Sequence, residues 1–172
     1  MAITKIQSES LNLADTYAFT GTVTGAGGVN TPAFAARLTT AHAVGTDSWT
    51  KINVNTEVYD TDNCYDHSTN YRFTPTTAGK YIFYIQVGFD SLGDQDYVYG
   101  SLYKNGSQLW TDGNAIALTS ASSTSGNAVR YTITAEANGT SDYFELYGAH
   151  NYGSNRNSTT GWCFFGGYKI IE

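Results

Sequence analysis

The stretch that decides the fold is residues 71–90, YRFTPTTAGKYIFYIQVGFD. A short β-prone run ends at Pro75, and a turn leads into the alternating segment 80–89. Since successive side chains of a strand point to opposite faces, one face of this segment is predicted to lie in a core. That wholly apolar face carries Tyr81, Phe83, Ile85, Val87 and Phe89.

The opposite face of the same segment carries Ile82 and Tyr84 between Lys80 and Gln86. An antiparallel strand with one face in water normally alternates apolar and polar residues cleanly. A second face that is partly apolar is therefore expected to lie either under a loop or in a contact between subunits.

The composition of the 172-residue chain favours strands. Thr is the commonest residue, with 24 copies, and there are 14 Tyr and 8 Phe but only 8 Leu. β-branched and aromatic side chains fit a pleated sheet, and apolar residues follow helical spacing for no longer than about two turns. The chain is predicted to be all-β and long enough for one domain.

Charge and apolar runs exclude several classes of function. The formal net charge is -6 and Lys and Arg do not cluster, so binding to a nucleic-acid backbone is not expected. The first ten residues lack the apolar core of a signal peptide, and no run is long enough to span a membrane. Cys64 and Cys163 are expected to be either two reduced thiols in or near the core or one disulfide.

Residues 1–29 differ from the rest and are predicted to be an N-terminal docking arm with a Gly-rich hinge, followed by a head at 30–172. The alternative is an edge strand of the same domain with a ragged terminus. The apolar residues available for docking are Ile3, Ile6, Leu11, Leu13, Tyr17 and Phe19.

The head divides into eight to ten β-prone runs separated by turn-forming residues. Asn105–Gly106 between two such runs is a strong signal for a hairpin. Residues 49–59 are predicted to be one strand, 118–127 a polar loop, and 150–161 a second polar loop. This spacing indicates a two-sheet sandwich or jelly roll.

The spacing of Phe73, Gly79, Tyr81 and Phe83 resembles the core signature of a known family. That family comprises the globular head of complement component one, subcomponent q, and its tumour-necrosis-factor-like (TNF-like) relatives. Further similar positions cover about residues 32–171: they are 32–38, Asp60 with Tyr65, 102–106, and Phe165 to Tyr168. The chain departs from the family at Thr74, where the family often has Cys, and at Val54 and Ile85, where it usually has aromatic residues.

The resemblance implies a ten-stranded antiparallel jelly-roll sandwich that assembles as a compact homotrimer. A trimer contact would account for Ile82 and Tyr84, and for a stripe of Tyr97, Tyr99 and Tyr103, which is otherwise expected to be a core face. The arm resembles the opening of virion proteins of marine tailed bacteriophages. That likeness implies a location in the virion, with the arm bound to other virion proteins.

Two polar regions are candidate sites. Asp60, Asp62 and Asp66 offer oxygen ligands that suit Ca²⁺, but the same residue types also form turns. The loop 148–161 mixes an aromatic ring, a guanidinium and amides, which suits a host-surface glycan or protein epitope, or it is an ordinary solvated loop. Its candidate ligand-binding residues are His150, Asn151, Tyr152, Asn155 and Arg156.

No catalytic motif occurs, so no enzyme activity and no cofactor other than calcium is expected. The leading hypothesis is a trimeric knob on a head or tail fibre that binds the host surface. The alternative is a capsid-decorating or other structural virion protein without a host ligand. A third hypothesis is a secreted-type binding module or an enzyme.

Overall fold

The computed structural model describes residues 29–109, 116–119 and 126–171 of the chain, and these contain strands, turns and bends. Among them no helix is long and apolar enough to cross a membrane. The strands are β1 (Ala33–Arg37), β2 (Ala43–Val44), β3 (Thr50–Lys51), β4 (Thr56–Asp60), β5 (Tyr65–Asp66), β6 (Arg72–Phe73), β7 (Gly79–Phe89), β8 (Tyr97–Lys104), β9 (Ser107–Gln108), β10 (Ile116–Thr119), β11 (Asn127–Ala137), β12 (Phe144–His150), β13 (Arg156–Asn157) and β14 (Phe164–Lys169).

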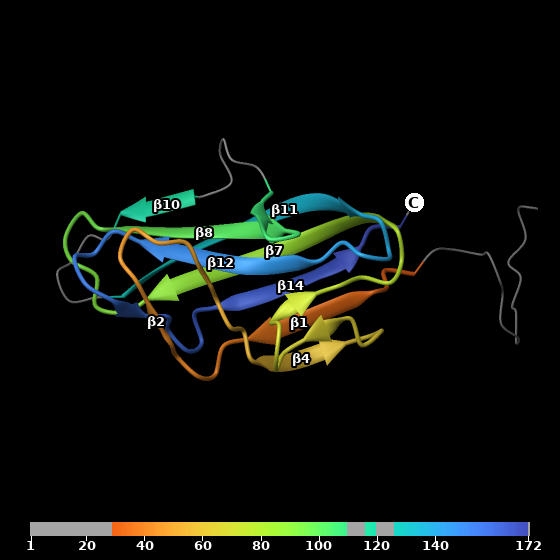
Figure 1. The fold of residues 1–172 in the computed structure, drawn as a ribbon, viewed down its shortest axis with the longest axis horizontal. Coiled ribbons are helices and arrows are strands. Elements are labelled where there is room, and N and C mark those ends of the chain that lie inside the picture. Colours follow the sequence, from red (N-terminus) through yellow and green to blue (C-terminus); the bar gives the residue numbers. More distant parts are fainter. Residues whose placement is uncertain (1–28, 110–115, 120–125, 172) are drawn as a thin grey trace, which may run out of the picture.

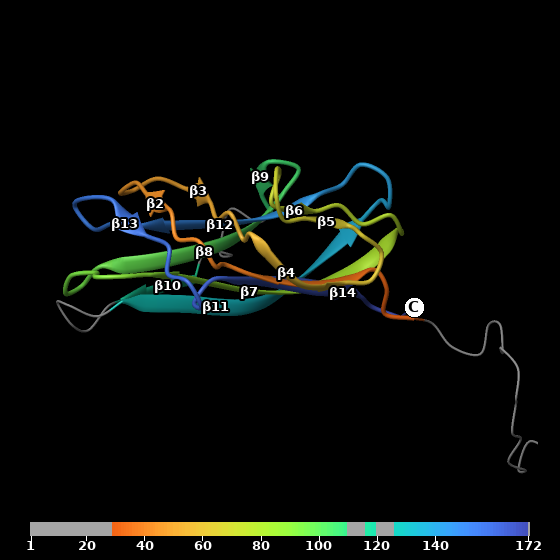
Figure 2. The ribbon, with the colours of Figure 1, turned by 90° about the horizontal axis from the view of Figure 1, so that it is seen from below.

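Two antiparallel sheets form the sandwich. Sheet I has the order β11-β7-β14-β1-β4, and its strands run side by side in Figure 1. Sheet II has the order β10-β8-β12-β6-β5, with β3 added to β12 and β9 added to β8. Figure 2 shows the two layers edge-on. The two five-strand paths correspond to the ten strands of the predicted jelly roll.

The core lies between the two sheets, and the predicted inner face of β7 is confirmed. Tyr81, Phe83, Val87 and Phe89 have no exposed surface, and Ile85 is also buried. Sheet II faces them with four fully buried side chains, which are Val98, Leu102, Phe144 and Leu146. A core made mainly of aliphatic and aromatic side chains supplies the main driving force for folding.

The prediction of one strand at 49–59 is wrong, because the chain changes sheets there. β3 pairs with β12 in sheet II, whereas β4 pairs with β1 in sheet I. The crossing segment buries Ile52 and Val54 completely, and Ile52 N–H donates to the Leu146 carbonyl at 2.8 Å. The alternation of apolar residues at 49–59 therefore comes from a buried crossover between the two sheets and not from a continuous strand.

Several turn predictions are confirmed and one loop is corrected. Asn105 and Gly106 have φ of 54° and 76° at the β8–β9 hairpin, as an Asn-Gly turn requires. The loop predicted at 118–127 is shorter than expected, because β10 continues to Thr119 and β11 begins at Asn127. Cys64 and Cys163 are both buried free thiols, so the prediction of two reduced thiols is confirmed.

Candidate functional site

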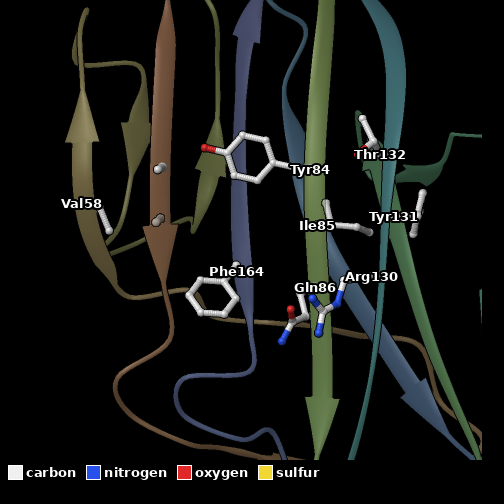
Figure 3. Close-up of a pocket in the computed structure, with 10 residues that line it drawn as sticks. Val58, Tyr84, Ile85, Gln86, Arg130, Tyr131, Thr132 and Phe164 are labelled. Carbon is white, nitrogen blue, oxygen red and sulfur yellow. The ribbon is translucent and has the colours of Figure 1, made fainter.

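The outer face of sheet I is built around Tyr84 on β7. Tyr84 pairs with Gly166 of β14, and its ring lies so closely over that glycine that a Cβ there would collide with the Tyr84 Cζ atom. The ring reaches across β14 towards β1 (Figure 3). Its hydroxyl lies 3.4 Å from the Tyr59 hydroxyl and donates to the Phe34 carbonyl at 3.4 Å. One aromatic side chain thus ties the middle strands of the sheet together.

Beside Tyr84 the face is hollowed. The hollow has a volume of about 290 Å³ and is bordered by side chains from all five strands of the sheet (Figure 3). Its apolar walls include Ala35, Val58 and Phe164, while Gln86 and Arg130 lie side by side at one end. Val58 is 61% exposed. An exposed and mainly apolar sheet face is typical of a protein–protein contact.

The centre of this face is uncharged. Burial raises the pKa of Tyr84 far above its ordinary value, and the hydrogen bond to Tyr59 and the nearby phenol of Tyr168 raise it further. Tyr84 therefore stays neutral over the physiological pH range, so it can be buried in a contact without the cost of desolvating a charge.

The predicted trimer residues do not lie on one surface. Ile82 shares the outer face of sheet I with Tyr84 and is partly buried there. Tyr97, Tyr99 and Tyr103 lie on β8 in sheet II, where the alternate residues Val98 and Leu102 fill the core. The tyrosine stripe is therefore an outward face of the opposite sheet. Its interpretation as a core face is wrong, while the part of these tyrosines in a trimer contact stays a prediction.

The ligand prediction for His150 is corrected, because His150 is a core residue. β12 runs one residue further than expected and turns His150 inward, where it is 1% exposed. Its Nε2 lies 3.0 Å from the Val44 carbonyl, and its ring meets Phe89 edge-on at 5.0 Å. A side chain held in this way has no access to a ligand.

The remaining loop candidates contact other residues of the protein. The guanidinium of Arg156 lies over the ring of Tyr152 at 3.3 Å from its centroid. Asn151 Oδ1 accepts from Tyr97 N–H at 2.6 Å, and the Asn155 carbonyl accepts from Arg156 at 3.2 Å. Arg156 also belongs to β13, which pairs with β2. The aromatic face expected to receive a ligand is thus covered by Arg156, while the role of the loop in binding stays a prediction.

The three acidic candidates for calcium organise turns. Asp60 accepts from the Tyr65 N–H at 2.6 Å, and Asp62 accepts from the hydroxyl of Thr61 at 2.6 Å. Asp66 accepts hydrogen bonds from three consecutive residues, Ser68, Thr69 and Asn70. Within the described residues no three His, Cys, Asp or Glu side chains are grouped closely enough to hold a metal ion. Calcium binding stays a prediction.

The hydrogen bonds to Asp66 predict that the stabilisation this carboxylate gives to the fold is lost at acid pH. The N–H of Thr69 and the donors of Ser68 and Asn70 outweigh desolvation and hold the Asp66 pKa far below its ordinary value. A carboxylate whose folded pKa is depressed stabilises the fold above its unfolded pKa of about 4, and this contribution is lost as pH falls through the folded value. Asp66→Ala is expected to destabilise the protein at pH 7, by an amount that shrinks steadily from about pH 4 to pH 2.

Urea unfolding at a series of pH values measures this difference. Asp94→Ala, which removes an exposed carboxylate, is the matched control and is expected to change stability little. A difference between wild type and Asp66→Ala that stays constant from pH 7 to pH 2 would rule out the proposed role of the Asp66 hydrogen bonds.

The predicted docking residues of the arm lie outside the described residues. Other residues of the surface were missed by sequence reasoning, among them Val58, Phe164 and Gly166 on sheet I and Trp49 and Tyr147 on sheet II. The alternation of β12 places Tyr147 outward with Glu145, a signal present in the sequence. The position of Gly166 under Tyr84 depends on the pairing of β7 with β14, for which the sequence carries no local signal.

No protein-family model matches the sequence, and no curated protein does. The fold does match solved structures. Murine APRIL superposes with a TM-score of 0.55 at 12% identity, covering 80% of this chain and 98% of APRIL. Eiger TNF from S. frugiperda gives 0.51 at 16% identity, covering 81% of this chain and 93% of the other.

The fold of the PRD1 vertex protein P5 is about as similar to this chain as the folds of APRIL and Eiger TNF are. It superposes with a TM-score of 0.53 at 14% identity, and the match covers 83% of this chain and 99% of P5. At these identities the similarity concerns the fold. This chain has an all-β, TNF-like jelly-roll fold.

Proposed function

We propose that this protein is a non-enzymatic structural component of a bacteriophage virion, and that it self-associates as a homotrimer through the outer face of sheet I. The trimer forms a knob on a head or tail fibre and binds the host surface. The observation that carries the proposal is the exposed apolar face around Tyr84, which an isolated chain would leave in water.

The chemistry of this face favours self-association. Its centre is apolar and neutral, whereas the chain as a whole carries a net charge of -6 and repels other copies at long range. Burial of the exposed Val58 and of Tyr84 would offset that repulsion. Homo-oligomers usually close with rotational symmetry, and the resemblance of the Phe73–Phe83 signature to the TNF-like family implies the threefold form.

Two further points support a virion component. The similarity in fold to the PRD1 vertex protein P5 supports this setting. Residues 1–29 provide apolar side chains that suit attachment to other virion proteins. The alternative within the same setting is a capsid-decorating protein without a host ligand. The likeness to Eiger TNF and APRIL supports a secreted-type binding module as the third candidate.

Adsorption competition tests the host-binding role. Purified full-length protein at saturating concentration is expected to reduce the adsorption of virions that carry it, with Tyr84→Asp as a matched control that lowers the number of binding sites per particle. Gold-labelled antibodies are expected to mark fibre tips. Uniform labelling of the head lattice without competition would refute host attachment and favour capsid decoration.

A further inference from the structure

The outer face of sheet II carries a continuous row of aromatic rings. Its members come from β8, from β12, and from the residue that immediately precedes β3, and they are Tyr97, Tyr99, Tyr103, Tyr147 and Trp49. Along β8 alone, the seven residues from Tyr97 to Tyr103 span about 20 Å. The row thus has the length of several linked sugar rings.

Each ring of the row contacts the next. Tyr97 lies 6.1 Å from Tyr99, which lies 5.9 Å from Trp49, and Trp49 lies 6.2 Å from Tyr103, centroid to centroid. Tyr103 stacks on Tyr147 at 3.7 Å. The planes of the first three pairs are inclined by 45°, 58° and 52°. The surface is therefore corrugated, and mutual packing holds the rings in place before any ligand arrives.

The row is partly open to solvent. Tyr97 is 40% exposed, and the other four side chains are partly buried. Within the described residues, none of the four tyrosine hydroxyls has a hydrogen-bond partner. Burial raises the pKa of both Tyr103 and Tyr147, so these phenols stay protonated and keep a donor as well as an acceptor.

Two lysines beside the row are paired within the protein, and the guanidinium of Arg72 lies over the ring of Tyr143 at 4.4 Å. Lys51 pairs with the buried Glu145 at 3.0 Å, and Lys104 pairs with Asp142 at 2.9 Å. The row therefore presents neutral aromatic surface with neutral hydroxyl groups. It complements an uncharged ligand that has both apolar faces and many hydroxyls, and the two paired lysines are not available to a phosphate or a nucleic acid.

We propose that this aromatic row is a binding site for neutral glycans. The C–H faces of pyranose rings pack against the aromatic rings, and sugar hydroxyls bond to the phenol hydroxyls of the row. The inclined ring planes match a glycan chain whose successive sugars are rotated with respect to one another. This inference deepens the proposed function, on which it rests for its biological role, since it gives the host-surface ligand a chemical class and a location.

Titration calorimetry with full-length protein tests the site. The probes are three neutral hexasaccharides (cellohexaose, laminarihexaose and chitohexaose), with polygalacturonate as the charged comparison. At least one neutral hexasaccharide is expected to bind, and Trp49→Ala is expected to weaken that binding at least 10-fold. Trp162→Ala is the matched control, because Trp162 is 40% exposed and packs at Gly88 of sheet I, away from the row. The affinity of Trp162→Ala for the hexasaccharide is expected to equal that of wild type.

The same samples separate this proposal from its alternatives. If Trp49→Ala is unfolded by circular dichroism, Tyr97→Ala takes its place, because Tyr97 is the more exposed ring. Failure of all three neutral hexasaccharides to bind at millimolar concentration overturns the proposal, as does preferential binding of polygalacturonate. Loss of the trimer in Trp49→Ala would show the row to be a subunit contact instead. A monomeric wild-type protein that binds a hexasaccharide would refute the proposed assembly and leave the glycan site standing.

Discussion

Replacement of Tyr84 by aspartate is expected to convert the trimer into folded monomers. In the proposed contact the new carboxylate would be buried without a partner and repeated three times around the axis. An unpaired buried charge costs about 3 kcal/mol or more, which weakens each contact at least about 100-fold. The fold itself should lose much less stability, because Tyr84 lies on the outer face of sheet I and not in the core between the two sheets. Sedimentation velocity at micromolar concentration measures the change.

Two control variants isolate the effect of charge on this face. Tyr84→Phe keeps the ring over Gly166 and loses the hydroxyl, so it is expected to remain trimeric. Tyr97→Asp adds the same charge at a 40% exposed tyrosine on sheet II, and it is also expected to remain trimeric. A Tyr84→Asp protein that sediments as wild type would refute the placement of the contact on sheet I.

Phe83→Ala is expected to have the largest effect on folding, a loss of about 3–5 kcal/mol. The Phe83 side chain has no exposed surface, and its ring lies 4.5 Å from that of Phe144 across the two sheets. It also packs directly on Gly167, where a Cβ would approach its ring to 2.7 Å. Its other ring neighbours are Phe73, Tyr81 and Phe165, which are fully buried themselves, so we expect the cavity left by alanine to close only in part. Because domains of this size are stable by about 5–15 kcal/mol, a large share would be lost.

Chemical unfolding of the isolated variants measures this loss. Phe164→Ala is the matched control, since Phe164 is a partly buried aromatic residue on the outer face of sheet I. It is expected to cost less in folding and more in assembly than Phe83→Ala. A folding loss below 1 kcal/mol for Phe83→Ala would contradict the placement of Phe83 at the centre of the core.

Local periodicity made the core of this protein predictable. The alternation of β7 identified Tyr81, Phe83 and Ile85 as inward residues, because a strand has only two faces and one of them was wholly apolar. The same rule failed at 49–59, where Ile52 and Val54 alternate but belong to a crossover between sheets. The alternation of apolar residues predicts which side chains are buried, but it does not predict which sheet a residue joins.

The surfaces were less predictable because they depend on pairing between distant segments. Tyr84 was recognised as unusual, but its position over Gly166 follows from the register of β7 with β14, some 80 residues away in the sequence. Trp49 joins the tyrosines of β8 only because β3 adds to β12. His150 was misplaced by one residue at the end of β12, and one residue reverses the face of a strand.

The two outer faces of the sandwich thus differ in chemistry and in proposed role. Sheet I offers an apolar hollow around a neutral tyrosine, which suits contact with another copy of the chain. Sheet II offers a row of aromatic rings with neutral hydroxyls, which suits a neutral glycan. A trimer built on sheet I leaves three copies of the sheet II row available for multivalent binding to one surface.

The mass of the native assembly tests the central claim most directly. Light scattering on full-length wild-type protein, coupled to size exclusion at micromolar concentration, is expected to give three times the 18.6 kDa chain, about 56 kDa. The mass should stay the same over a tenfold dilution, as a stable contact through sheet I requires. A mass near 18.6 kDa at every concentration would contradict the proposed assembly.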